Sequence, residues 1–123
     1  MKIISSLEEL NIPFNYKAFI LHFLSNLSKV EHVSKVVLFG SCSRGDFRER
    51  SDIDILVIVD EEISIDEELY IMSECPPSGD DECYIPADII VDPICNYNRF
   101  KETFGMLQKA VEQEGVDLSE LLR

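Results

Sequence analysis

Two aspartates separated by one residue, Asp52 and Asp54, stand at the start of the segment 52–60, which is rich in β-branched residues. Alternate residues of a β-strand point to the same face, so we expect both carboxylates on one face and Ile53 and Ile55 on the other. Two neighbouring carboxylates repel each other by on the order of 1 to 4 kcal/mol unless a cation offsets the repulsion. Carboxylate oxygens are ligands that Mg²⁺ prefers. The pair therefore indicates either a metal site or, with equal weight, two solvated acids.

A glycine and a serine follow a short apolar run, residues 36–39, which predicts a buried strand. Gly40 permits a tight turn and a close approach of a ligand to the backbone. If residues 41–47 begin a helix, its first N–H groups favour an anion, and the Ser41 hydroxyl could donate to a phosphate oxygen while Arg44 adds positive charge. Taken alone, Gly-Ser after a strand is more often a simple turn.

A third aspartate, Asp88, lies within the apolar run Ala87-Asp88-Ile89-Ile90-Val91. A carboxylate in a buried strand is costly unless it is paired or binds a metal, whereas an acid on an edge strand can face water. If this strand lies beside the one that carries Asp52 and Asp54, the three acids form a nest for one or two divalent ions. Such a nest suits phosphoryl or nucleotidyl transfer, in which Asp88 would help to deprotonate the acceptor hydroxyl.

Hydrophobic periodicity predicts the elements that must position these residues. The expected order is an amphipathic helix over 16–30, strands over 36–39 and 52–60, a short helix within 61–74, a loop over 75–81, a strand over 84–91, a helix over 100–111 that ends at Gly115, and a further helical turn or two within 117–122. Asn15 is the expected N-cap of the first helix, and His22 lies on the polar face of that helix. Pro86 is expected at the start of its strand or on an edge. This order predicts one α/β or α+β layer structure.

Composition limits the class of protein further. The 123 residues, 46% of them hydrophobic, predict a single domain over 1–123. The net charge of −13 argues against binding to DNA or RNA, because nucleic-acid affinity depends on Lys and Arg. The sequence has neither a membrane-spanning apolar stretch nor a signal peptide, which predicts a cytoplasmic protein without a membrane partner. The four cysteines form no C-x-x-C pair and favour free thiols over a zinc site, with Cys75, Cys83 and Cys95 as the remaining zinc alternative.

The combined motif resembles the signature of the DNA polymerase β-like nucleotidyltransferase superfamily. It consists of Leu38-Phe39-Gly40-Ser41, ten further residues, and Asp52-Ile53-Asp54. Within that superfamily the chain is most similar to the minimal nucleotidyltransferases of bacteria and archaea. Arg44-Gly45 and Ser51 fit the spacer of these proteins, and Asp88 matches their third carboxylate.

This resemblance implies a nucleotidyltransferase fold, a small mixed β-sheet flanked by helices, with Mg²⁺ and ATP at the edge of the sheet. It assigns catalysis and metal binding to Asp52, Asp54 and Asp88, and nucleotide binding to Gly40, Ser41 and Arg44. Many minimal members are antitoxins encoded beside HEPN-type toxins, which they silence by attaching AMP from ATP to a tyrosine hydroxyl. The same function is therefore expected here, and Cys42 and the long acidic segment 61–83 are departures from the family pattern.

Two other functions are compatible with the sequence. One is nucleotidyl transfer to the hydroxyl of a small molecule such as an antibiotic. Such relatives usually carry an extra helical domain, which 123 residues cannot accommodate unless a dimer mate supplies it. The other is a non-catalytic module that binds a basic toxin through its own acidic surface.

Overall fold

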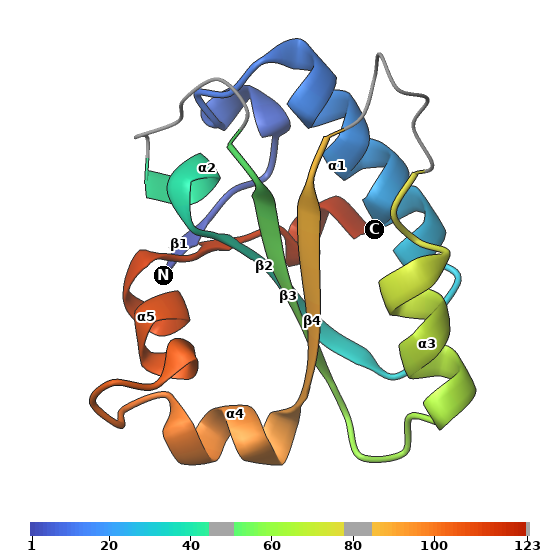
Figure 1. Cartoon of the computed structure of the whole chain (residues 1–123), viewed down its shortest axis with the longest axis vertical. Coiled ribbons are helices and arrows are strands. Elements are labelled where there is room, and N and C mark those ends of the chain that lie inside the picture. The colour runs from blue at the N-terminus through green and yellow to red at the C-terminus, as the bar shows by residue number, and fades with distance from the viewer. Residues whose placement is uncertain (45–50, 78–84, 123) are drawn as a thin grey trace.

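The computed structural model describes residues 1–44, 51–77 and 85–122 and shows a five-stranded mixed sheet (Figure 1). The spatial order of the strands is β1-β5-β2-β3-β4. Their bounds are β1 (Lys2–Ile3), β2 (Val33–Phe39), β3 (Ile53–Val59), β4 (Ala87–Pro93) and β5 (Val116–Asp117). β3 pairs with β2 antiparallel and with β4 parallel, while β5 pairs with β2 antiparallel and with β1 parallel. The predicted fold class is confirmed.

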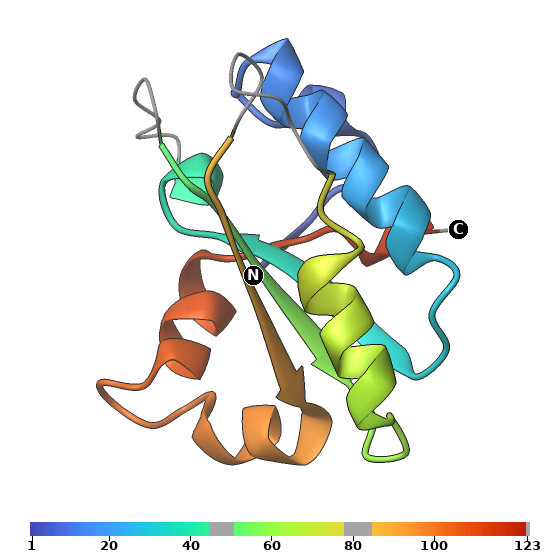
Figure 2. The same ribbon diagram turned by 45° about the vertical axis from the view of Figure 1, so that its right-hand side comes forward.

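Helices cover both faces of the sheet (Figure 2). α1 (Phe14–Leu27) and α3 (Ile65–Ser73) lie on one face, whereas α4 (Ile94–Phe100) and α5 (Leu107–Glu114) lie on the other. The one-turn helix α2 (Ser41–Arg44) directly follows β2. Two 3-10 helices, η1 (Leu7–Glu9) and η2 (Ser119–Leu122), precede α1 and follow β5.

The alternation of β3 divides the interior into two cores. Its odd-numbered residues join the larger core, which α1 and α3 cover: Ile53, Ile55, Val57 and Val59. Leu56 and Ile58 join a smaller core with Tyr97 of α4 and Val111 of α5. Each fully buried aliphatic side chain contributes about 1.5–3 kcal/mol, so exchanging the two faces would be costly. Asp54 is consequently held on the face of α4 and α5, as the strand pattern predicts.

Several predicted elements are confirmed with shifted bounds. The helix within 61–74 is α3, which Ser64 and Glu67 begin with a reciprocal capping box. Pro86 immediately precedes β4, an edge strand, and its carbonyl accepts a hydrogen bond from the Ile53 amide at 2.9 Å. His22 is exposed, and η2 supplies the expected turn within 117–122. The predicted loop 75–81 extends outside the described residues.

Two predictions about helix boundaries are wrong. α1 begins at Phe14 with Pro13 as its N-cap, because the fixed φ of proline, here −61°, suits the residue before a helix. The helix expected over 100–111 is instead two helices, α4 and α5, separated by a turn in which Gly105 has a φ of +81°. That left-handed conformation interrupts the helical periodicity that joined the two segments.

Gly115 ends α5 as predicted, but for a different physical reason. Its φ of −70° is accessible to any residue. A Cβ at this position would lie 2.5 Å from the Val111 carbonyl oxygen and 2.6 Å from Cγ1 of Val37. The glycine therefore permits close packing of the end of α5 against β2.

The remaining observations concern cysteines and membranes. Cys42 and Cys75 are buried and Cys95 is exposed, and none of these three described cysteines forms a disulfide, while Cys83 lies outside the described residues. None of the helices described is long and apolar enough to cross a bilayer.

Candidate functional site

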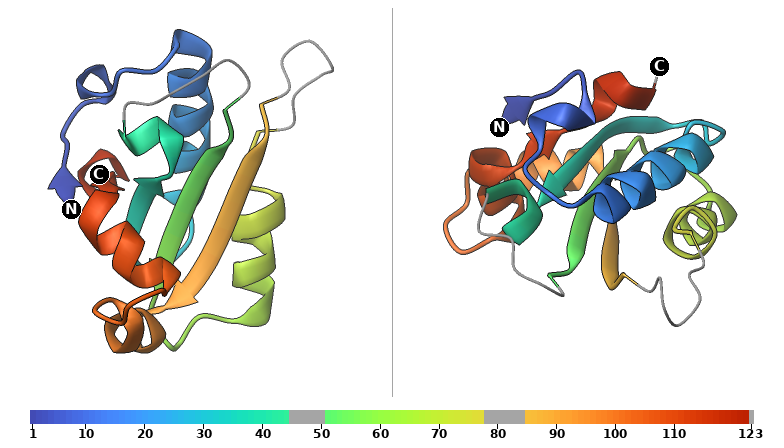
Figure 3. Two further views of the ribbon diagram at one scale, coloured as in Figure 1. Left: turned by 60° about the vertical axis from the view of Figure 1, so that its left-hand side comes forward. Right: turned by 90° about the horizontal axis from the view of Figure 1, so that it is seen from above.

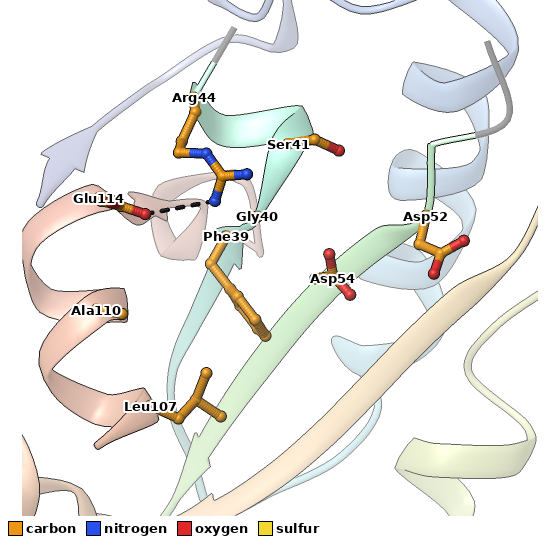
Figure 4. A pocket seen from close by; sticks show the side chains of 9 residues that line it. All are labelled: Phe39, Gly40, Ser41, Arg44, Asp52, Asp54, Leu107, Ala110 and Glu114. Carbon is orange, nitrogen blue, oxygen red and sulfur yellow. Dashed lines mark hydrogen bonds and ion pairs between the residues drawn. The ribbon is translucent and has the colours of Figure 1, made fainter. Parts of the chain in front are cut away.

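A cavity of about 450 Å³ is lined by residues of α2 and α5 and of the adjoining ends of β2 and β3. Figure 3 shows α2 and α5 beside these strands. Its lining comprises Phe39, Gly40, Ser41, Arg44, Asp52, Asp54, Leu107, Ala110 and Glu114 (Figure 4). The volume is in the range of small-molecule sites. Five of the six residues predicted for nucleotide and metal binding thus line one cavity, and Asp88 alone does not.

Gly40 makes the turn from β2 into α2 and faces Asp54. Its φ of +76° lies in the left-handed region that favours glycine. A Cβ at this position would overlap Oδ2 of Asp54. Both the backbone conformation and the close carboxylate therefore require glycine here. The carbonyl of Gly40 accepts hydrogen bonds from the amides of Ser43 and Arg44, at 3.1 and 3.2 Å, which starts α2.

The predicted helix at Ser41 is confirmed over residues 41–44, and residues 45–47 lie outside the described range. Ser41 and Arg44 both line the cavity, one at each end of α2 (Figure 4). Nη1 of Arg44 lies 3.5 Å from Oε2 of Glu114, and both side chains are roughly half exposed. Glu114 partly offsets the positive charge that Arg44 brings to the cavity.

The three aspartates are neighbours at one end of the β3–β4 pair. Asp52 is exposed just before β3, Asp54 is half-buried within it, and Asp88 is exposed on β4. Asp54 and Asp88 are direct partners in the parallel register. Burial raises the pKa of Asp54, the negative charges of Asp52 and Asp88 raise it further, and Arg44 opposes them. Asp54 is therefore a carboxylate whose ionised form the fold disfavours.

Contacts from distant parts of the chain hold the segment that carries Asp52. The Tyr16 hydroxyl of α1 donates to the Ser51 carbonyl at 2.7 Å. The buried Cys42 thiol of α2 donates to the Asp52 carbonyl at 3.4 Å. These bonds hold two successive peptide carbonyls, one on each side of the Asp52 Cα. Cys42, which departs from the family pattern, thus has a positioning contact.

The chemistry of these donors fits a divalent cation, although the acids do not converge on one point. In the part of the chain that the structure describes, no three His, Cys, Asp or Glu side chains are grouped so that they could hold a metal ion. A divalent cation would nevertheless relieve the repulsion that raises the pKa of Asp54. Carboxylate oxygens are also suitable ligands for Mg²⁺. Asp52 and Asp54, which both line the cavity, are the residues that could hold it.

Sequence reasoning missed the contribution of α5 to the cavity. Leu107 and Ala110 lie within the helix predicted over 100–111, and the sequence motif assigns no site role to them or to Glu114. The three residues follow the spacing i, i+3, i+7, which places them on one side of a helix. This spacing was visible in the sequence, but only the packing of α5 beside α2 turns that side toward Gly40 and Asp54.

Comparisons with known proteins agree with this geometry. The family described as "Polymerase beta, Nucleotidyltransferase" matches residues 22–91, which contain Gly40, Ser41, Asp52, Asp54 and Asp88. Two proteins of Methanocaldococcus jannaschii carry the name "Putative protein adenylyltransferase". One is 30% identical over 101 residues, which are 80% of this chain and 94% of that protein. The other is 57% identical over 28 residues, which are 23% of this chain and 28% of that protein.

Among solved structures, a crystal structure of a toxin-antitoxin with AMP-PNP matches 85% of this chain and 72% of its own chain. The TM-score is 0.50 and the sequence identity is 17%, so this likeness concerns the fold. The mixed sheet and the Gly-Ser turn beside paired aspartates define the chain as a nucleotidyltransferase. It belongs to the polymerase β nucleotidyltransferase family, as its motif indicated.

Proposed function

We propose that this nucleotidyltransferase is a Mg²⁺-dependent protein adenylyltransferase that transfers AMP from ATP to a tyrosine hydroxyl of a HEPN-type toxin, acting as its antitoxin. The single observation that carries the proposal is the cavity in which Gly40, Ser41 and Arg44 face Asp52 and Asp54. The similarity to a named protein adenylyltransferase along most of both chains supports a protein as the acceptor.

Phosphate binding falls to α2 and the turn before it. Gly40 makes the left-handed turn into α2 and has no side chain that would keep a phosphate away from the backbone of this turn. The Ser41 hydroxyl can donate a hydrogen bond to a phosphate oxygen, and Arg44 can supply positive charge beside it. In the reaction, the acceptor oxygen bonds to the α-phosphorus while the bond to the bridging oxygen breaks, and pyrophosphate leaves.

The aspartates hold the cation and receive the proton. Asp52 and Asp54 would bind Mg²⁺, which when bound neutralises phosphate charge and lowers the pKa of a coordinated hydroxyl. Asp88 lies opposite Asp54 on the exposed edge strand, where a hydroxyl of another protein can approach. In this proposal Asp88 accepts the proton of the acceptor hydroxyl.

The direct test incubates the full chain with ATP labelled at the α-phosphate, MgCl₂ and the HEPN-type protein of the same genome. We expect label on the partner protein, a mass increase of one or more AMP groups on tyrosine, and no transfer when EDTA replaces MgCl₂. Label at the γ-phosphate must remain in pyrophosphate. Absence of transfer to a partner that forms a complex with the chain contradicts the proposal.

Two other outcomes identify the alternative functions. Labelling of aminoglycosides in a parallel panel, without labelling of the protein, would indicate a small-molecule acceptor. Neutralisation of the toxin by a chain with both Asp52→Asn and Asp54→Asn would indicate that binding alone silences it. The charge of −13 supports the second alternative, because it complements a basic, RNA-cleaving partner.

A further inference from the structure

The turn between α4 and α5 displays an unusually exposed aromatic residue. Phe104 is 91% exposed, the highest value among the large hydrophobic residues that the structure describes, and the turn projects away from the sheet (Figure 1). The turn is nevertheless ordered by backbone hydrogen bonds, from Thr103 to Phe100 at 3.0 Å and from Met106 to Thr103 at 3.2 Å. Gly105 provides the positive φ that this turn needs. Phe104 is therefore held in an exposed position by a defined backbone.

This exposed surface is continuous with the proposed nucleotide cavity. A second hollow, of about 530 Å³, is lined by Phe104, Met106, Leu107 and Ala110 among others. Leu107 and Ala110 also line the cavity that contains Asp52 and Asp54. A partner that packs on Phe104 would therefore be adjacent to the reacting groups. An apolar surface of this kind, next to a site, is typical of a protein-binding surface.

The charge around the turn differs from the charge of the chain. Residues 94–114, which comprise α4, the turn and α5, contain three basic side chains, Arg99, Lys101 and Lys109, and three acidic ones, Glu102, Glu112 and Glu114. The Lys109 ammonium lies 5.8 Å from the centre of the Phe104 ring. Residues 61–74, in contrast, contain six acidic and no basic side chains. The α4–α5 turn thus offers an apolar anchor with positive charge beside it, in a protein that is otherwise strongly acidic.

We propose that the α4–α5 turn, with Phe104, Leu107 and Lys109 as its contacts, is the docking surface for the acceptor protein. The occupant is a segment of that protein with an apolar or aromatic side chain, which packs against Phe104 and Leu107, and a neighbouring acidic side chain, which pairs with Lys109. The anchor leaves the acceptor hydroxyl beside the cavity. This inference rests on the proposed transfer of AMP to a protein.

The chain offers a matched control for the anchor. Phe14 is 85% exposed and is the first residue of α1, a helix that covers the opposite face of the sheet from α4 and α5. With the HEPN-type protein as acceptor, Phe104→Ala should raise the KM for the acceptor at least tenfold, as truncation of an interface hot spot does. Phe14→Ala should leave that KM within twofold of the unsubstituted chain. Both variants should bind a non-hydrolysable ATP analogue with unchanged affinity.

The charge is tested in the same way. Lys109→Glu should raise the KM for the acceptor, more strongly at low than at high ionic strength, and Lys35→Glu on β2 should not. An unchanged KM for Phe104→Ala, in an otherwise active enzyme, overturns the inference and leaves the proposed function standing. So does a loss of transfer in Leu69→Ala alone, which would place the acceptor on α3. If the unsubstituted chain transfers no AMP, the proposed function fails and the inference fails with it.

Discussion

Two aspartates of the same strand, Asp88 and Asp92, are treated by the fold in opposite ways. Asp92 bonds to residues of α4 and α5, and Asp88 points to the same face of the sheet because it lies four residues away on β4. Asp92 is 5% exposed and accepts hydrogen bonds from Nδ2 of Asn96 at 2.7 Å and from Nε2 of Gln108 at 3.1 Å. Asp88 is exposed, and its partner across the sheet is another aspartate, Asp54.

The comparison distinguishes Asp92, a carboxylate that stabilises the fold, from Asp88, a carboxylate that is available for a reaction. At the buried end, two neutral amide donors satisfy Asp92, so its burial is stabilised. At the open end, burial and then the negative charges of Asp52 and Asp88 raise the pKa of Asp54, so the protein itself does not balance the charge of this group. Only at the open end can a bound cation, together with a nucleotide, neutralise negative charge that the protein leaves unbalanced. Four mutational or pH experiments test this contrast.

The largest effect is expected at the open end, on activity. Asp54→Asn removes a proposed cation ligand and should lower the rate of AMP transfer by about 100-fold or more, as loss of one transition-state-stabilising group does. The rate is measured with ATP labelled at the α-phosphate. Asp66→Asn, a change of the same type on the exposed surface of α3, should retain activity. Full activity in Asp54→Asn would remove Asp54 from the mechanism.

The next effect is expected at the buried end, on stability. Asp92→Ala leaves the Asn96 and Gln108 donors without their acceptor and should lower the free energy of unfolding by about 2–3 kcal/mol. Urea unfolding at pH 7 measures the change. Asp88→Ala, four residues away and exposed, should change it by no more than about 0.5 kcal/mol. Equal losses in the two variants would contradict the contrast between the two ends.

A smaller effect should appear in the pH dependence of stability. Because the fold raises the pKa of Asp54, protonated Asp54 favours folding. This contribution is complete below the unfolded pKa of 3.8 and is lost as pH rises through the folded value. Asp54→Asn should therefore gain stability relative to the unsubstituted chain between pH 3 and pH 7, in thermal unfolding without Mg²⁺. A constant difference across this range would contradict the raised pKa of Asp54.

The smallest effect is expected for the ion pair at the rim of the cavity. Arg44 and Glu114 are both about half exposed, and their pair should contribute no more than about 1 kcal/mol. Glu114→Gln should leave the unfolding midpoint nearly unchanged. It should strengthen binding of an ATP analogue, because the negative charge of Glu114 no longer offsets the positive charge of Arg44. Arg44→Gln should weaken that binding. Calorimetric titration of both variants separates this role from a structural one.

The sequence by itself determined which residues could react and which faces they occupy. The alternation of Asp52, Ile53, Asp54 and Ile55 sets two faces, because successive side chains of a strand point in opposite directions. Gly40 before Ser41 predicts a tight turn, and the structure makes this turn with a φ of +76° at Gly40. These features depend on neighbours within a few residues, so they can be predicted without knowledge of the fold.

Tertiary structure alone decided what surrounds those residues. The bond from Tyr16 to Ser51 and the pair of Arg44 with Glu114 join positions 35 and 70 residues apart, and no local pattern indicates such partners. The two-residue strands β1 and β5 are too short for an alternation to show. The division between α4 and α5 depends on one turn at Gly105, within a periodicity that otherwise continues. Such contacts form only when distant segments pack together, because their free energy comes from burial and hydrogen bonds across the fold.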